Sequence, residues 1–275
     1  MFIDWFSGTL VFRGIRYYIR KIREYGRTKF FKHLYPSDFK TLKTLRNSYE
    51  NQPCVIIGGG PSLNSIDFDQ LKHYITIACN GFFLKMEELD WKPTFYTIED
   101  PLPAKDNRTE IENLKNVTKI IPADLKRIIK RDKYTTYCNF RRSYLRPKRK
   151  DFPRFSFSFE KESFWGGTVV YFNLQLAAHL GCNPIYLVGV DLNYKIPPSV
   201  IRNGAVLTST EDDMNHFDPR YFGKGKKWHI PESERMNECI IKGYHQMKEK
   251  GIDILNASHP SKLKEVPRVI KFNKD

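Results

Sequence analysis

The stretch Cys54-Val-Ile-Ile-Gly-Gly-Gly-Pro-Ser62 constrains the fold of this chain more than any other. Its first four residues are apolar and β-branched, which is typical of a buried parallel strand. The three glycines allow positive φ and close backbone approach, and the Pro-Ser pair suits the first turn of a helix. A strand, a glycine turn and a helix start bring open N–H groups and a helix dipole to one point. We therefore expect an anion site of the phosphate type; a tight turn without a ligand is the alternative.

From Pro53 onward, apolar runs of strand length alternate with helical patterns, which predicts a mostly parallel sheet with helices on both faces. We expect one Rossmann-like α/β domain over residues 36–275, with long irregular segments at 140–165 and 192–230. The second of these segments is predicted to act as a mobile lid or loop. The predicted strands span 54–57, 75–79, 94–98, 118–121, 135–138, 185–190 and 252–255, and the predicted helices span 65–72, 107–114, 123–131, 168–180 and 232–250.

Several other classes of site are not supported. The glycine spacing is neither GxGxxG nor GxxxxGK[ST], so neither a dinucleotide site nor a P-loop NTPase is predicted. Asp67 and Asp69 have the spacing of a metal-binding DxD motif, but residues i and i+2 do not share a helix face, and we interpret the pair as surface. The five cysteines are widely spaced without a CxxC motif, which favours a reducing cytoplasm without disulfides or a zinc site.

The net charge of +15 is concentrated in two places, +6 over residues 1–32 and +10 over residues 126–154. Residues 1–35 form a predicted amphipathic basic helix, which we expect to lie on an anionic membrane surface. A helix packed on the domain or on a second subunit is the alternative. No apolar run has the length of a membrane span. The second basic stretch lacks a known nucleic-acid module, so we expect no nucleic-acid partner.

Polar residues follow several of the predicted strands, at the edge where α/β proteins bind ligands. Asn80 could hydrogen-bond a base or ribose, and Asp191 a sugar hydroxyl. Gly166, Gly167 and Thr168 open a predicted helix and would supply a second cluster of N–H donors. Each feature alone is also compatible with capping or turn chemistry.

The segment from Asn215 to His229 holds two histidines, a tyrosine and several cations. Histidine titrates near neutrality, so His216 or His229 could deprotonate a hydroxyl acceptor. Tyr194 and Tyr221 could donate hydrogen bonds to a leaving phosphate. A solvated basic loop with packed histidines is the alternative.

As a set and in this order, these motifs resemble the bacterial CMP-sialic-acid-dependent sialyltransferases of glycosyltransferase family 42. They are also similar to the related domain of the Maf flagellin glycosyltransferases and MptE-like proteins. The resemblance covers roughly residues 52–260. It departs from family 42 at the third glycine, where those enzymes have asparagine, and at Trp228-His229, which lacks their Gly-His-Ser context.

The resemblance implies roles for individual residues. His229 matches the catalytic base by its place before the last long helix, with His216 as the other candidate. Tyr194 and Tyr221 would assist the leaving phosphate. The implied donor-binding residues are Gly58, Gly59, Gly60, Pro61, Ser62, Asn80, Gly166, Gly167, Thr168, Gly189 and Asp191.

The implied function is an inverting glycosyltransferase that moves an acidic sugar (sialic acid, another nonulosonate or Kdo) from a CMP-sugar to a cell-surface glycan. No metal or other cofactor would be required. The acceptor could be lipid-linked, which agrees with a peripheral place on the inner face of the cytoplasmic membrane, in lipopolysaccharide or capsule synthesis. Two alternatives remain, an MptE-like hydroxymethylpterin diphosphokinase and a non-catalytic module that binds anionic glycan or membrane. The oligomeric state stays open, a homo-oligomer included.

Overall fold

A seven-stranded sheet forms the centre of the computed structural model, which describes residues 10–142 and 152–270. All neighbouring strands run parallel. The spatial order is β12-β8-β1-β2-β3-β4-β5. The α/β fold with a mostly parallel sheet is as the sequence predicts. The strands are β1 (Cys54–Ile57), β2 (Ile75–Cys79), β3 (Phe95–Thr97), β4 (Thr118–Pro122), β5 (Thr135–Cys138), β8 (Ile185–Val188) and β12 (Ile254–Asn256).

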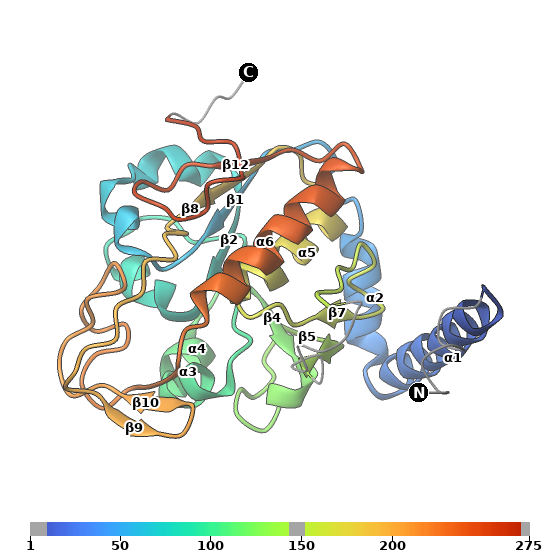
Figure 1. Cartoon of the computed structure of the whole chain (residues 1–275). Helices are drawn as coiled ribbons and strands as arrows, with labels where there is room; N and C mark the ends of the chain where they lie inside the picture. The colour runs from blue at the N-terminus through green and yellow to red at the C-terminus, as the bar shows by residue number, and fades with distance from the viewer. Residues whose placement is uncertain (1–9, 143–151, 271–275) are drawn as a thin grey trace, which may run out of the picture.

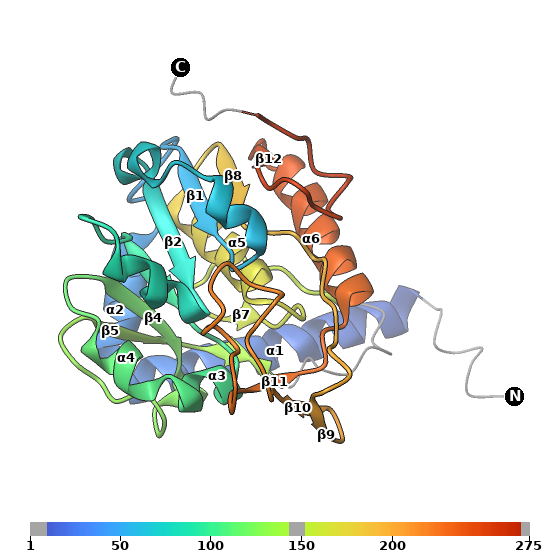
Figure 2. The same ribbon diagram turned by 90° about the vertical axis from the view of Figure 1, so that its left-hand side faces the viewer.

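Alternate residues of each central strand point to opposite faces of the sheet, and each face packs against a different layer. On one face Cys54 and Ile56 belong to a core shared with the helices on that side, while Val55 and Ile57 belong to a second core on the other face. The first layer contains α2 (Pro36–Leu45), α5 (Val169–Leu180) and α6 (Ser233–Lys248). The second contains short 3-10 turns, with α3 (Pro101–Asp106) and α4 (Arg108–Asn113) farther along the sheet. Figures 1 and 2 show α5 and α6 lying together on their face.

The strand order fixes where a ligand can bind. From β1 the chain proceeds outward through β2, β3, β4 and β5, and then returns to place β8 on the other side of β1. The order therefore switches between β1 and β8, and the loops that leave these two strands diverge there. Ligands of open α/β sheets bind in the crevice at such a switch point.

Two predicted helices are replaced by shorter turns. Residues 65–72 form parts of the 3-10 helices η2 (Pro61–Ser65) and η3 (Phe68–His73), and of residues 123–131 only Ala123–Leu125 is helical, as the 3-10 helix η5. Side chains satisfy the backbone groups that a continuous helix would use. The Asp67 side chain accepts the Asp69 N–H at 3.1 Å, and the Glu112 side chain accepts the Lys130 N–H at 2.9 Å. Another 3-10 helix, η4 (Asn80–Glu87), follows β2 directly.

The predicted irregular segment 192–230 contains regular structure. Its strands β9 (Ile201–Asn203), β10 (Val206–Thr208) and β11 (Lys227–His229) form a small antiparallel sheet. Two further strands, β6 (Phe140–Arg141) and β7 (Ser163–Phe164), pair beside the main sheet. The last strand of this small antiparallel sheet ends at His229, one of the two candidate bases. The role of the segment as a mobile lid stays a prediction.

The predicted N-terminal helix is present as α1 (Leu10–Leu34), and residues 1–9 lie outside the described part of the chain. Figure 1 shows α1 projecting from the side of the molecule near α2. Within the described ranges, no helix combines the length and the apolar character needed to cross a bilayer. All five cysteines are buried and free.

Candidate functional site

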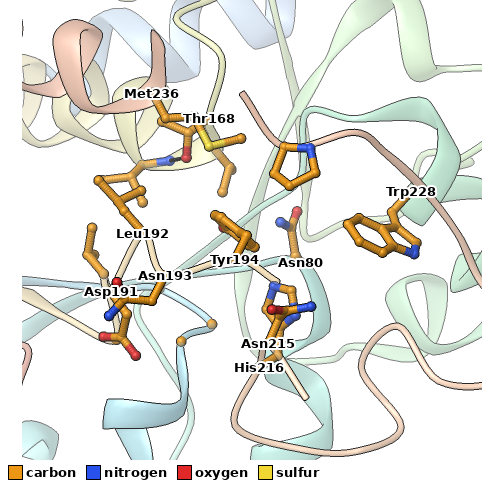
Figure 3. Close-up of a pocket in the computed structure, with 18 of the residues that line it drawn as sticks. Asn80, Thr168, Asp191, Leu192, Asn193, Tyr194, Asn215, His216, Trp228 and Met236 are labelled. Carbon is orange, nitrogen blue, oxygen red and sulfur yellow. Dashed lines mark hydrogen bonds between the residues drawn. The ribbon is translucent and has the colours of Figure 1, made fainter. Parts of the chain in front are cut away.

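A cavity of about 1400 Å³ opens at the carboxyl ends of the central strands, beside the switch point. It is lined by almost all of the residues singled out in the sequence. Figure 3 shows Asn80, Tyr194 and His216 converging on it from three separate segments. The predicted site residues that line it are Gly58, Gly59, Gly60, Pro61, Ser62, Asn80, Gly167, Thr168, Gly189, Asp191, Tyr194, His216, Tyr221 and His229.

Gly166 is the predicted site residue that does not line the cavity. A Cβ atom at this position would lie 2.1 Å from Cδ1 of Tyr171, so the glycine is needed for packing against that ring. The assignment of Gly166 to donor binding stays a prediction. Its neighbours do face the cavity, and the Thr168 hydroxyl caps α5 by accepting the Val170 N–H at 3.3 Å.

The glycine loop after β1 is held tightly by the loop after β8. The Gly60 N–H donates to the Gly189 carbonyl at 2.8 Å, and the Ser62 N–H donates to the Asp191 carboxylate at 2.9 Å. The Ser62 hydroxyl also donates to Asp191. The expectation of open amides and a free serine hydroxyl is thus wrong for these groups, because the Asp191 carboxylate already acts as their anion.

The glycines are required for close approach and not for positive φ, since none of Gly58 to Gly60 has a positive φ. A Cβ at Gly58 would lie 2.4 Å from the Gly189 carbonyl oxygen, and one at Gly60 would lie 2.5 Å from Cγ of Asp191. A Cβ at Gly59 would lie 2.8 Å from the Tyr221 hydroxyl. The loop is therefore wedged between two segments that follow β8.

Gly60→Ala is expected to lower the free energy of unfolding by about 1–3 kcal/mol, because Asp191 and the Gly189 backbone must move to admit the methyl group. Thermal or urea unfolding measures this loss. Gly26→Ala is the matched control, since Gly26 lies within α1 with no atom within 4 Å of an added Cβ. The control should lose no stability. Equal stability of Gly60→Ala and wild type would contradict the close packing.

His229 stands at the end of β11 and pairs with Asp100, which follows β3. Its Nδ1 lies 2.7 Å from Oδ2 of Asp100, while Oδ1 of Asp100 accepts the Leu102 N–H at 2.8 Å and caps α3. The adjacent Lys227 N–H donates to Asp106 at 2.6 Å, which fixes β11 against α3. The hydrogen bond with Asp100 raises the pKa of His229 above its ordinary value. About half of the His229 side chain is exposed, so solvent or substrate can reach it.

His216 forms a second histidine–aspartate pair, but it is enclosed. Its Nδ1 lies 2.7 Å from Oδ2 of Asp213, and its ring stacks on Tyr221 with centroids 3.9 Å apart. Its side chain is 7% exposed. Burial favours the protonated form of Asp213, but hydrogen bonds, first that with His216, lower its pKa below the ordinary value. His216 is thus built into the wall beneath the glycine loop, whereas His229 stands at a more open position.

The two predicted site tyrosines, Tyr221 and Tyr194, also differ in how exposed they are. Tyr221 is 3% exposed and stacks on His216, and both rings lie against Gly59 in the cavity wall. Tyr194 is partly exposed and its ring centroid lies 5.9 Å from that of His216. Burial raises the pKa of Tyr194 to about 12, which keeps its phenol protonated as a hydrogen-bond donor near neutrality.

Asn80 occupies the turn directly after β2, with a φ of 49°. Its backbone carbonyl accepts the Tyr96 hydroxyl at 2.5 Å, which fixes this conformation. Its side-chain Oδ1 is buried and has no hydrogen-bond partner within the described residues. An unsatisfied buried acceptor at a cavity wall indicates a place where a ligand N–H or O–H group can bind.

Glu99 and Arg142 also line the cavity, and this pair was not predicted from the sequence. Arg142 contacts Glu99 Oε2 at 3.3 Å and Asp124 at 2.7 Å. Burial raises the pKa of Glu99 to about 7, although Arg142 opposes the shift. Glu99 lies directly after the third predicted strand, and Arg142 lies in the basic stretch 126–154, so the sequence pattern does not connect them.

The described residues contain no cluster of three or more histidine, cysteine or acidic side chains arranged for a metal ion. The carboxylates of the cavity have protein partners, since Glu99 pairs with Arg142 and Asp100 with His229. The acidic neighbours Asp212 and Asp213 lie outside the cavity lining.

The fold and the cavity define an α/β protein with a Rossmann-like sheet and a ligand site at the switch in strand order. The family model described as "6-hydroxymethylpterin diphosphokinase MptE-like" matches residues 29–197, more than half of the chain, and the chain belongs to this MptE-like family. Among curated proteins there is no significant match.

Among solved structures, the MAf glycosyltransferase from Magnetospirillum magneticum AMB-1 is similar, with 17% sequence identity and a TM-score of 0.49. The similarity covers 84% of this chain and 38% of that one, so this chain spans less than half the length of that protein. The family match supports the MptE-like part of the resemblance in the sequence. The link to family 42 stays a prediction.

Proposed function

We propose that the protein is a group-transfer enzyme that binds a CMP-activated acidic sugar in the cavity and transfers the sugar to a glycan hydroxyl. The observation that carries the proposal is the His229–Asp100 pair, which lines the same cavity as the glycine loop and Asn80. A histidine oriented by a carboxylate is the usual arrangement of a general base.

The geometry defines how His229 would act. If the Nδ1–H group donates to Asp100, Nε2 is the ring nitrogen that accepts a proton. Nε2 would take the proton of the acceptor hydroxyl as its oxygen attacks the anomeric carbon, with inversion at that carbon. The imidazolium that forms would be stabilised by Asp100, and the acceptor would approach from the side of β11 and α3.

The leaving CMP would be stabilised by other groups that line the cavity. The start of α5, where Gly167 and Thr168 line the cavity, would place the positive end of the helix dipole near the phosphate. Tyr194, protonated near neutrality, would donate a hydrogen bond to the phosphate. Asn80 Oδ1, the unsatisfied acceptor, would receive a hydrogen bond from the base or ribose. A sugar activated by one phosphate does not oblige the enzyme to use a metal clamp.

The direct test is incubation with CMP-activated sugars and measurement of released CMP. We expect release with at least one of the sialic, legionaminic, pseudaminic or Kdo donors, increased by a glycan acceptor. No release with any of them would contradict the proposal.

The family match favours a second candidate, transfer of diphosphate from ATP to a hydroxymethylpterin. This reaction needs carboxylates for Mg²⁺, and Glu99 and Asp100 would supply them at the cavity wall. They would have to exchange their present partners, Arg142 and His229, for the metal. A rise in Tm with CMP alone favours the first candidate, whereas a rise that needs both ATP and Mg²⁺ favours the second.

The pH dependence of CMP-sugar turnover should report the His229–Asp100 pair. A general base acts in its neutral form, so kcat/KM should increase with pH through a midpoint above 6.5, because Asp100 raises the pKa of His229 above that ordinary value. In Asp100→Asn the midpoint should move to lower pH and the plateau should fall. Asp213→Asn, which alters the pair at His216, is the matched control and should leave the midpoint in place. An unchanged midpoint in Asp100→Asn would argue against His229 as the base.

A further inference from the structure

The helix α1 is attached to the rest of the protein by one face. Arg27 contacts Glu162 at 3.0 Å, and Arg154 contacts Glu24 at 2.5 Å. Phe31 is 4% exposed and belongs to the core on the sheet face that α2, α5 and α6 cover. Residues 24, 27 and 31 follow one another at helical spacing, so they define the face of α1 that is turned toward the domain.

The opposite face of α1 exposes a row of large apolar side chains. Ile15, Ile19 and Ile22 are 50%, 44% and 70% exposed. They are spaced i, i+4 and i+7, and at 100° per residue they lie on the far side of the helix from the attached face. Scattered exposed apolar residues are ordinary, but a continuous row on one helix face marks an interaction surface. We call Ile15, Ile19 and Ile22 the apolar row.

Positive charge borders the apolar row. Arg23 and Lys29 are exposed and lie on its two sides along the helix, with Lys21 and Lys32 also exposed. The only acidic residue in the sequence of α1 is Glu24, which belongs to the attached face. The outward face therefore combines apolar side chains with cations, the combination that binds anionic lipid. A second copy of the same face would bring like charges together.

We propose that α1 binds the surface of an anionic bilayer, with the apolar row among the acyl chains and Arg23 and Lys29 at the lipid phosphates. The ion pairs of Arg27 and Glu24 then hold the α/β domain at the membrane surface. This inference is independent of the reaction in the cavity, because it uses the outward face of α1 only.

Vesicle sedimentation with the full chain tests the proposal. Wild type should bind phosphatidylcholine vesicles that contain phosphatidylglycerol much more strongly than pure phosphatidylcholine vesicles, and added salt should weaken the binding. Ile19→Asp with Ile22→Asp should reduce the partition coefficient about 100-fold, because both side chains lose their place in the acyl region. Arg23→Gln and Lys29→Gln should each reduce it about fivefold.

The matched control is Ile196→Asp with Ile201→Asp, which changes two apolar residues of similar exposure outside α1. Its vesicle binding should equal that of wild type. Far-UV circular dichroism shows whether the variants keep the helix. The proposal is overturned if the Ile19/Ile22 variant binds vesicles like wild type, or if wild type binds both vesicle types equally. It is also overturned if light scattering finds a dimer that the Ile19/Ile22 variant dissociates, without vesicle binding by wild type.

Discussion

Turnover of a CMP-sugar by His229→Ala is expected to fall about 10²–10⁴-fold, the usual contribution of a positioned general base. The KM for the donor should change little, because the proposed donor contacts are Asn80, Tyr194 and the start of α5. Steady-state kinetics with a coupled CMP assay measures both parameters. Since the His229 side chain is about half exposed, its removal should not prevent folding.

His245→Ala is the matched control, because His245 is an exposed histidine of α6 outside the cavity lining. It should turn over donor at the wild-type rate. Loss of turnover in His216→Ala together with full turnover in His229→Ala would assign the base to His216. If a variant with both His216 and His229 replaced by alanine keeps the phenotype that wild type confers on the cell, the protein is a binding module and not a transferase.

Asp132→Ala is expected to lower the free energy of unfolding by about 3–5 kcal/mol, because it leaves a buried amine without its counter-ion. Lys119 on β4 is fully buried, and its Nζ lies 2.9 Å from Asp132 Oδ2 and 3.2 Å from the Ile111 carbonyl. Lys119→Met is the matched variant and should cost less, since methionine fills a similar volume and Asp132 is 25% exposed to water. Urea unfolding measures both losses. A smaller loss in Asp132→Ala than in Lys119→Met would contradict this assignment.

The ion pair of Asp132 with Lys119 also predicts how the free energy of unfolding changes in acid. Burial disfavours the charged form of Asp132, but hydrogen bonds from Thr135 and Lys119 lower its pKa from 3.8 to about 2. A carboxylate with a lowered folded-state pKa stabilises the protein fully above its unfolded pKa. The contribution should therefore be complete above pH 3.8 and disappear as the pH falls toward 2. Asp132→Ala should lack this part of the pH dependence.

The central sheet was predictable because its strands are short apolar runs bounded by turns. Residues 54–57, 75–79 and 135–138 are strands with the predicted limits, and α5 begins one residue after its predicted start at Thr168. These elements are specified by local pattern and are reinforced by burial on both faces. The short turns at 61–73 and 123–125 were not predictable, because contacts between side chains and backbone decide whether such a segment continues as a helix.

The cavity residues were predictable as strand-end polar groups, but their partners were not. Asp100 and His229 are 129 positions apart, and their pairing depends on the small antiparallel sheet reaching α3. Asp191 looked like a sugar ligand because it follows a buried strand, yet its carboxylate is used by Ser62. Local pattern indicates which residues reach an edge of the sheet, whereas long-range contacts determine which of them remain available.

The size of the cavity bears on the order of the reaction steps. Sites for a single small ligand usually measure about 300–1,000 Å³, and this one measures about 1400 Å³. Donor and acceptor then have room to occupy it simultaneously, and direct transfer in a ternary complex is expected to show sequential rather than ping-pong kinetics.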